Sequence, residues 1–134
     1  MTATISARLS TSRDSLLRFA LRADAVLSGL TGIGLLLLAP KVAAVSGTTA
    51  AVEYTTGALF VVFAATVLAL AARPAIRTSG LVVAAGNALY ALASVVVVLA
   101  GVWPLTTTGT VLTLGCGAYT LVMAELQYQG VRRI

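Results

Sequence analysis

Four long apolar segments, separated by short polar or proline-containing connections, take up most of the chain. They cover about residues 16–39, 52–72, 79–102 and 106–128. A bilayer core about 30 Å thick needs roughly 20 apolar residues per helix, so each segment can cross a membrane. The short connections force neighbouring helices to run antiparallel. The pattern therefore predicts an all-α polytopic membrane protein, a compact antiparallel four-helix transmembrane bundle.

Breaking residues place the ends of these predicted helices. Pro40 and Lys41 are expected to end the first, Pro74 closes the second, and Trp103 marks the interface at the end of the third. Residues 1–12 are rich in Ser, Thr and Ala and have no apolar period, which predicts a disordered tail. Residues 13–134 are then a single transmembrane domain.

Composition supports a membrane location. Of the 134 residues, 59% are hydrophobic and 10% are charged, whereas soluble domains carry roughly 25% charged residues. The net charge of +5 comes from arginines that flank the apolar segments and form no patch with interleaved aromatic residues. Nucleic acid is therefore not an expected partner, and the lipid bilayer is.

The basic residues are distributed unevenly between the two sides. Eight of the nine precede the first segment, lie between the second and third, or follow the fourth: Arg8, Arg13, Arg18, Arg22, Arg73, Arg77, Arg132 and Arg133. Only Lys41 lies on the other side. The positive-inside rule then predicts a bacterial inner-membrane protein with both termini in the cytoplasm.

Residues for catalysis or cofactor binding are scarce. The chain has no histidine and one cysteine, Cys116, so the usual metal and haem ligand sets are missing. No nucleophile, phosphate-binding or metalloprotease motif is present. We therefore expect neither an enzyme nor a bound cofactor or metal, and no catalytic residue is assigned.

Small residues at helical spacing predict the packing faces, because close backbone approach drives helix association in lipid. Each of the four segments carries such a stripe: Ser28 and Gly32; Ala58, Ala65, Ala69 and Ala72; Gly80, Ala84, Asn87, Ala91 and Ser94; Thr113, Gly117, Thr120 and Ala124. Helix packing is the favoured interpretation, and a ligand groove is the alternative.

Asn87 is the strongly polar side chain nearest to mid-membrane. A buried amide needs hydrogen-bond partners, so we expect Asn87 to fix the register between helices. The alternative is an amide that contacts a substrate, with Tyr90 close by.

Two acidic residues, Asp24 and Glu125, lie toward the arginine-rich ends of the first and fourth segments. We expect both to be ionised and paired with arginines such as Arg22, closing the bundle at that end. Proton coupling by one of these acids is the alternative, because acids inside a membrane are often functional.

Several short motifs resemble those of a group of small four-span integral membrane proteins of actinobacteria, whose function is largely undefined. They are Arg22-Ala23-Asp24-Ala25, Ser28-Gly29, Asn87-Ala88-Leu89 and Ala124-Glu125-Leu126-Gln127-Tyr128. Size and span number give a more distant similarity to DoxX-type proteins. The resemblance singles out Asp24, Asn87, Glu125 and Gln127 and implies no established substrate.

These observations favour a non-enzymatic accessory or assembly subunit, which docks on a larger membrane complex or forms a homo-oligomer. The helix faces are its main contact surface, because little of the chain lies outside the membrane. The alternative is a small transporter or a bundle that binds lipid or another hydrophobic ligand. That alternative needs a polar or widened interior around Asn87, Tyr90 and Tyr119.

Overall fold

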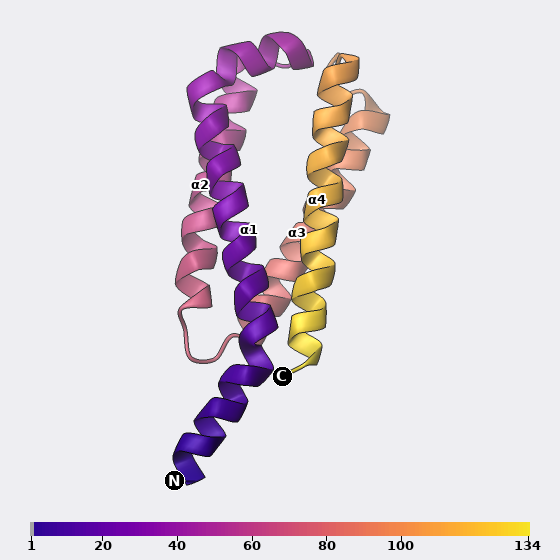
Figure 1. Ribbon diagram of the computed structural model, residues 1–134. Helices are drawn as coiled ribbons and strands as arrows, with labels where there is room; N and C mark the ends of the chain where they lie inside the picture. The colour runs from indigo at the N-terminus through magenta and orange to yellow at the C-terminus, as the bar shows by residue number, and fades with distance from the viewer. Residues whose placement is uncertain (1) are drawn as a thin grey trace.

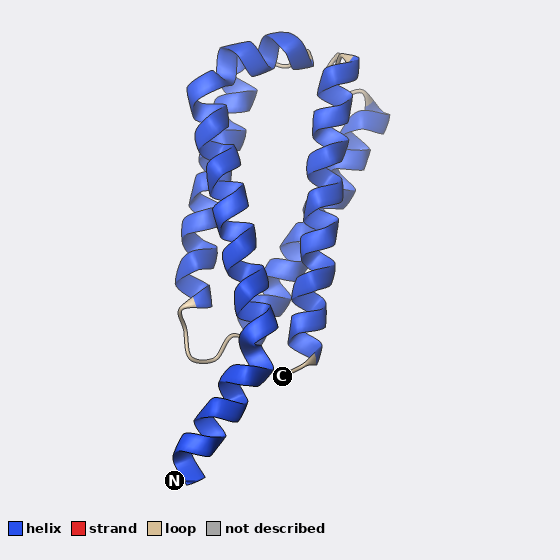
Figure 2. Ribbon diagram, in the orientation of Figure 1, coloured by secondary structure: helices blue, strands red, loops and turns tan. Residues whose placement is uncertain are grey.

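The computed structural model describes the backbone of residues 2–134 and the side chains from Arg13 onward. Its elements are four helices: α1 (Thr2–Ser46), α2 (Ala50–Ala71), α3 (Arg77–Ala100) and α4 (Thr107–Arg132). All four are long and apolar enough to cross a membrane. The described chain is helix and short connections, without strands (Figure 2). The predicted compact antiparallel four-helix transmembrane bundle is thus confirmed, and the protein is an integral membrane protein.

The helices form two hairpins. α1 packs closely along α2 and α3 along α4, the two hairpins meet mainly through α1 and α4, and α2 and α3 touch at only a few points. α1 and α4 lie in front of α2 and α3, and both carry their arginine-rich ends at the bottom of the view (Figure 1). We call the end of the bundle that holds the start of α1 and the end of α4 the arginine-rich end, and we call the opposite end the Lys41 end.

The first helix does not end at Pro40, as the sequence predicts. Its backbone leaves helical geometry at Leu38 (φ −121°, ψ 15°), and α1 continues to Ser46 with Pro40 inside it. Proline lacks an N–H and crowds the carbonyl four residues earlier, so it bends the helix here instead of ending it. After the kink, α1 runs across the Lys41 end of the bundle toward α4 (Figure 1).

The kinked segment of α1 is tied to the α3–α4 hairpin. Thr106 N donates to the Ser46 carbonyl at 3.0 Å, and its hydroxyl donates to the Val45 carbonyl at 2.5 Å. Gly109 lies directly against the Ser46 backbone, where a Cβ atom would not fit. The two hairpins are therefore joined at the Lys41 end as well as along α1 and α4.

The backbone of residues 2–12 belongs to α1, whereas the sequence predicts a disordered tail there. No glycine or proline interrupts the helix between these residues and Arg13. The side chains of this segment lie outside the described part of the structure.

An apolar core fills the arginine-rich end. Leu17 of α1 is fully buried and packs against glycines of two other helices: a Cβ on Gly80 would lie 2.7 Å from Leu17 Cδ2, and one on Gly130 would lie 2.8 Å from Leu17 Cα. The core residues come from all four helices: Leu17, Leu21, Ala25, Val67, Ala71, Ile76, Val83 and Val131.

The small-residue stripes of three helices face inward as predicted, and that of α2 does not. Gly80, Ala84, Asn87 and Ser94 of α3 are buried, as are Ser28 and Gly32 of α1, and Gly117, Thr120 and Ala124 of α4. In α2 the predicted alanines 58, 65, 69 and 72 are exposed, and the buried positions are Glu53, Gly57, Ala64, Val67 and Ala71. Alanine is frequent on every face of α2, so its spacing could not identify the packed face.

Candidate functional site

A carboxylate surrounded by neutral hydrogen-bond donors lies inside the bundle. Asp24 and Gln127 are 0% exposed, and Asn87 is 4% exposed. Asn87 Nδ2 donates to Asp24 Oδ2 at 2.7 Å, and Gln127 Nε2 donates to the same oxygen at 2.8 Å. Asn87 Nδ2 also donates to Gln127 Oε1 at 3.0 Å. Asp24 of α1 therefore accepts hydrogen bonds from side-chain amides of both α3 and α4.

Two hydroxyl groups occupy the other oxygen of Asp24. Ser28 Oγ donates to Asp24 Oδ1 at 3.1 Å, and the Tyr119 hydroxyl donates to it at 3.0 Å. Each carboxylate oxygen thus receives two hydrogen bonds, which suits an ionised carboxylate because it is acceptor-only. We call the five residues Asp24, Ser28, Asn87, Tyr119 and Gln127 the Asp24 cluster.

The predicted pairing of Asp24 with arginine is wrong. Arg22 precedes Asp24 by two residues, which is about 200° around a helix, so Arg22 is exposed while Asp24 faces inward with Leu21. Arg18 turns to the end of α2, where its guanidinium donates to the carbonyls of Ala71 (2.8 Å), Arg73 (2.7 Å) and Pro74 (2.9 Å). It also forms an ion pair with Asp14 at 3.0 Å. Helix face, and not depth alone, selects the partners of Asp24.

Glu125 also lacks the predicted arginine partner among the described side chains. It is exposed on α4, and Gln129 Nε2 donates to its Oε1 at 2.7 Å. Gln127, two residues away, faces the opposite side of α4 and belongs to the Asp24 cluster. The two acids that the sequence groups together therefore occupy different environments, one internal and one on the outer surface.

Asn87 has the hydrogen-bond partners that its burial requires, on both α1 and α4. Tyr90 does not join it: its ring lies 5.7 Å from the Phe60 ring of α2, at an interplanar angle of 60°. The sequence predicts Ser28 only as a packing residue of α1 and Tyr119 only as a neighbour of Asn87 in the transporter alternative, and it predicts no contact of either with Asp24. Ser28 could have been found from the sequence because it lies four residues after Asp24, on the same helix face. Tyr119 carries no such local signal.

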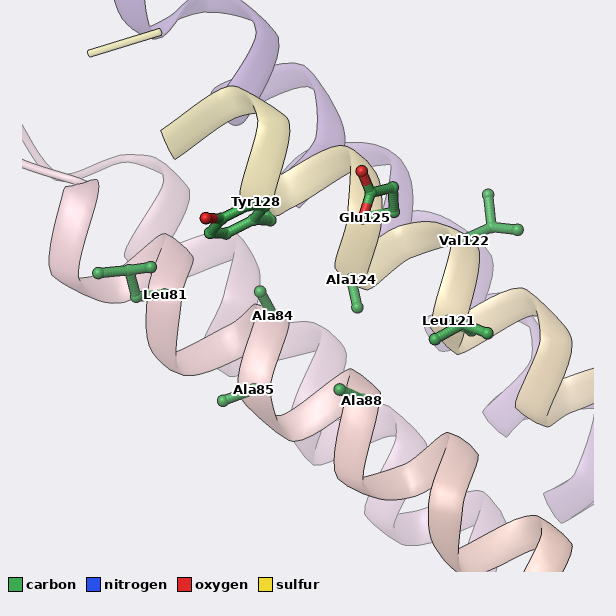
Figure 3. A pocket seen from close by; sticks show the side chains of 9 residues that line it. All are labelled: Leu81, Ala84, Ala85, Ala88, Leu121, Val122, Ala124, Glu125 and Tyr128. Carbon is green, nitrogen blue, oxygen red and sulfur yellow. The ribbon is translucent and has the colours of Figure 1, made fainter. Parts of the chain in front are cut away.

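A groove runs along the outer face between α3 and α4. One hollow, with a volume of about 670 Å³, is lined by Leu81, Ala84, Ala85, Ala88, Leu121, Val122, Ala124, Glu125 and Tyr128. A second hollow of about 440 Å³ shares Ala88 and Leu121 with the first and continues toward Ser94 and Leu114. Glu125 stands on α4 at the rim, and Ala84 and Ala124 form the floor (Figure 3). We call these two hollows the α3–α4 groove.

The described side chains contain no group of three or more His, Cys, Asp or Glu that could hold a metal ion. Comparison of the chain with protein-family models, curated proteins and solved structures finds no match. The resemblance to small actinobacterial membrane proteins therefore stays a prediction.

Proposed function

We propose that the protein is a non-enzymatic accessory or assembly subunit that binds a transmembrane helix of another membrane protein in the α3–α4 groove. The observation that carries the proposal is an exposed acid, Glu125, at the rim of a groove with an alanine floor. Small residues let helix backbones approach closely in lipid. The groove follows α3 from Leu81 to Val95, a length of about 21 Å and most of a bilayer core.

The charge of the groove indicates the chemistry of its partner. Glu125 lies seven residues before Arg132, about 10 Å along α4 from the arginine-rich end. An acid at this depth is costly when it faces hydrocarbon and is stabilised by a cationic partner. The partner helix should therefore carry a lysine or arginine level with Glu125. A two-fold pair of copies meeting groove to groove would instead bring two Glu125 side chains together.

Photocrosslinking in native membranes tests this proposal. A photoreactive residue at Ala88, an exposed residue that lines both hollows of the groove, should capture a stoichiometric protein with a basic residue in a membrane span. The same residue at Ala65, exposed on α2, is the matched control. Ala88→Trp and Glu125→Gln should each reduce capture of that partner, whereas Ala65→Trp should not.

Other outcomes of this experiment contradict the proposal. Equal capture from Ala65 and Ala88 would make the contact nonspecific, and a crosslink to a second copy would make the groove a homo-oligomer interface. Purification with a bound lipid or metabolite and no protein partner would favour a transporter or a lipid-binding bundle. That second candidate is favoured by the buried carboxylate of Asp24, because ionisable groups inside membranes often line substrate or ion pathways.

The proposal includes an orientation in the bacterial inner membrane, with both termini in the cytoplasm. Its support is the eight-to-one distribution of basic residues between the two ends. A cytoplasm-dependent reporter should be active when fused after Ile134, and a periplasm-dependent reporter should be active in the connection after Ser46. The reverse pattern would place the arginine-rich end outside.

A further inference from the structure

The Asp24 cluster has one ionisable carboxylate and no basic member. Its donors to Asp24 are two amides and two hydroxyls, all neutral at ordinary pH. Amide nitrogens bearing two hydrogens cannot accept a proton from Oδ2, and when both hydroxyls donate to Oδ1, all four hydrogen bonds point to an ionised acid. Burying a carboxylate without a positive charge is costly, even when it is hydrogen-bonded. The cluster therefore has the charge of a site for one positive ion.

Every member of the cluster also carries an oxygen atom that can bind a cation. The carboxylate supplies two, Ser28 and Tyr119 supply hydroxyl oxygens, and Asn87 and Gln127 have amide oxygens. A half-turn of a terminal amide exchanges its nitrogen for its oxygen with almost no change in shape. After this rotation, the amide oxygens of Asn87 and Gln127 face Asp24 Oδ2, and the hydroxyl oxygens of Ser28 and Tyr119 remain beside Oδ1. Hard cations prefer such all-oxygen sites.

The number of acids in the cluster and the distances between Asp24 and its donors indicate which type of ion the cluster can bind. Divalent ions are usually held by several carboxylates, and this cluster has one. The donor–acceptor distances to Asp24 range from 2.7 to 3.1 Å, so a small ion requires less expansion than a large one. We propose that the Asp24 cluster binds a small monovalent cation, with sodium as the cellular ion and lithium as its analogue. The bound ion links α1 of one hairpin to α3 and α4 of the other.

Thermal unfolding of the purified full-length protein tests the site. Sodium chloride is replaced stepwise by choline chloride at constant ionic strength, and lithium and potassium chloride are compared. Because an ion that binds only the folded state stabilises it, saturating sodium should raise the Tm by about 4 °C. Lithium should act similarly, potassium less, and choline not at all.

Matched variants test whether the sodium dependence of the Tm arises at the Asp24 cluster. Asp24→Asn should abolish the sodium dependence, whereas Glu125→Gln, which neutralises the exposed acid, should retain it. Should Asp24→Asn fail to fold, Ser28→Ala and Tyr119→Phe keep the carboxylate and each remove one oxygen. Each of these two variants should raise the sodium concentration at half-effect by about tenfold.

Two results would overturn the site. One is a Tm that is the same in sodium, potassium and choline. The other is an infrared band of a protonated carboxyl group at pH 7 that disappears in Asp24→Asn, which would make the cluster a proton site. The assay uses the isolated protein and does not involve the α3–α4 groove. Either result would therefore say nothing about the proposed partner helix, which the crosslinking experiment tests separately.

Discussion

The two sides of α1 contact their neighbours by different physical means. Toward α2 the contact is between backbones: a Cβ on Gly32 would lie 2.7 Å from the Gly57 carbonyl oxygen, and one on Gly57 would lie 2.9 Å from the Gly32 carbonyl oxygen. Toward α3 and α4, close packing of Leu17 on Gly80 and Gly130 is joined by a buried polar cluster that centres on Asp24. Close backbone packing joins α1 to α2, while buried hydrogen bonds add directional contacts between α1 and the α3–α4 hairpin.

The backbone contact and the polar cluster should respond differently to amino-acid substitutions. A glycine–glycine contact tolerates no added atom, because the opposing group is main chain and cannot rotate away. A hydrogen-bonded cluster tolerates a change of atoms but loses stability when a buried donor is left without an acceptor. The predictions below compare these two kinds of contact with each other and with the surface contact made by Arg18.

The largest effect is expected at the backbone contact. Gly32→Val should lower the free energy of unfolding by about 3 kcal/mol, because overpacking forces the two helices of the hairpin apart. Gly34→Val is the matched control in the same helix, since a Cβ on Gly34 meets nothing within 4 Å. Unfolding in mixed detergent micelles measures both. Equal losses at Gly32 and Gly34 would show that the close contact contributes nothing specific.

A smaller effect is expected in the polar cluster. Asp24→Ala should lower the free energy of unfolding by about 2 kcal/mol, because it leaves buried amide donors unpaired. Glu125→Ala is the control and should not lower the free energy of unfolding of the isolated protein, because this exposed acid leaves no buried donor unpaired.

A double-mutant cycle sharpens the same prediction. Asp24→Ala combined with Gln127→Ala should cost about 1 kcal/mol less than the sum of the single changes, because the two side chains share a hydrogen bond. Strict additivity would mean that the bond between them adds nothing to stability.

The smallest effect is expected at the arginine-rich end, where Arg18 binds carbonyls at the end of α2 and in the connection that follows it. Arg18→Met keeps much of the apolar stem and should lower the free energy of unfolding by about 1 kcal/mol, since water near the surface can replace part of the lost bonding. Arg22→Met, at an exposed position of the same helix, should change it by less than about 0.5 kcal/mol. Equal effects would attribute the loss to overall charge and not to the carbonyl contacts.

Local features of the sequence predicted the helices well. The apolar segments gave four spans whose limits lie within a few residues of α2 and α3, because hydropathy and helix breakers act on the segment that contains them. α4 continues past its predicted end at residue 128 to Arg132, and Gly130 lies within the helix because it packs against Leu17. Asn87 was expected to find partners on other helices and does, since a buried amide requires them wherever it lies.

The sequence by itself thus determined the number of spans, the asymmetric charge and the need of Asn87 for partners. Only the tertiary structure decided that Asp24 faces amides and not arginines, that Glu125 faces outward, and that the packed face of α2 contains Gly57 and not Ala58. Periodicity places residues on a common helix face but does not say which neighbour covers that face. That choice depends on the simultaneous packing of four helices, and no single segment contains that information.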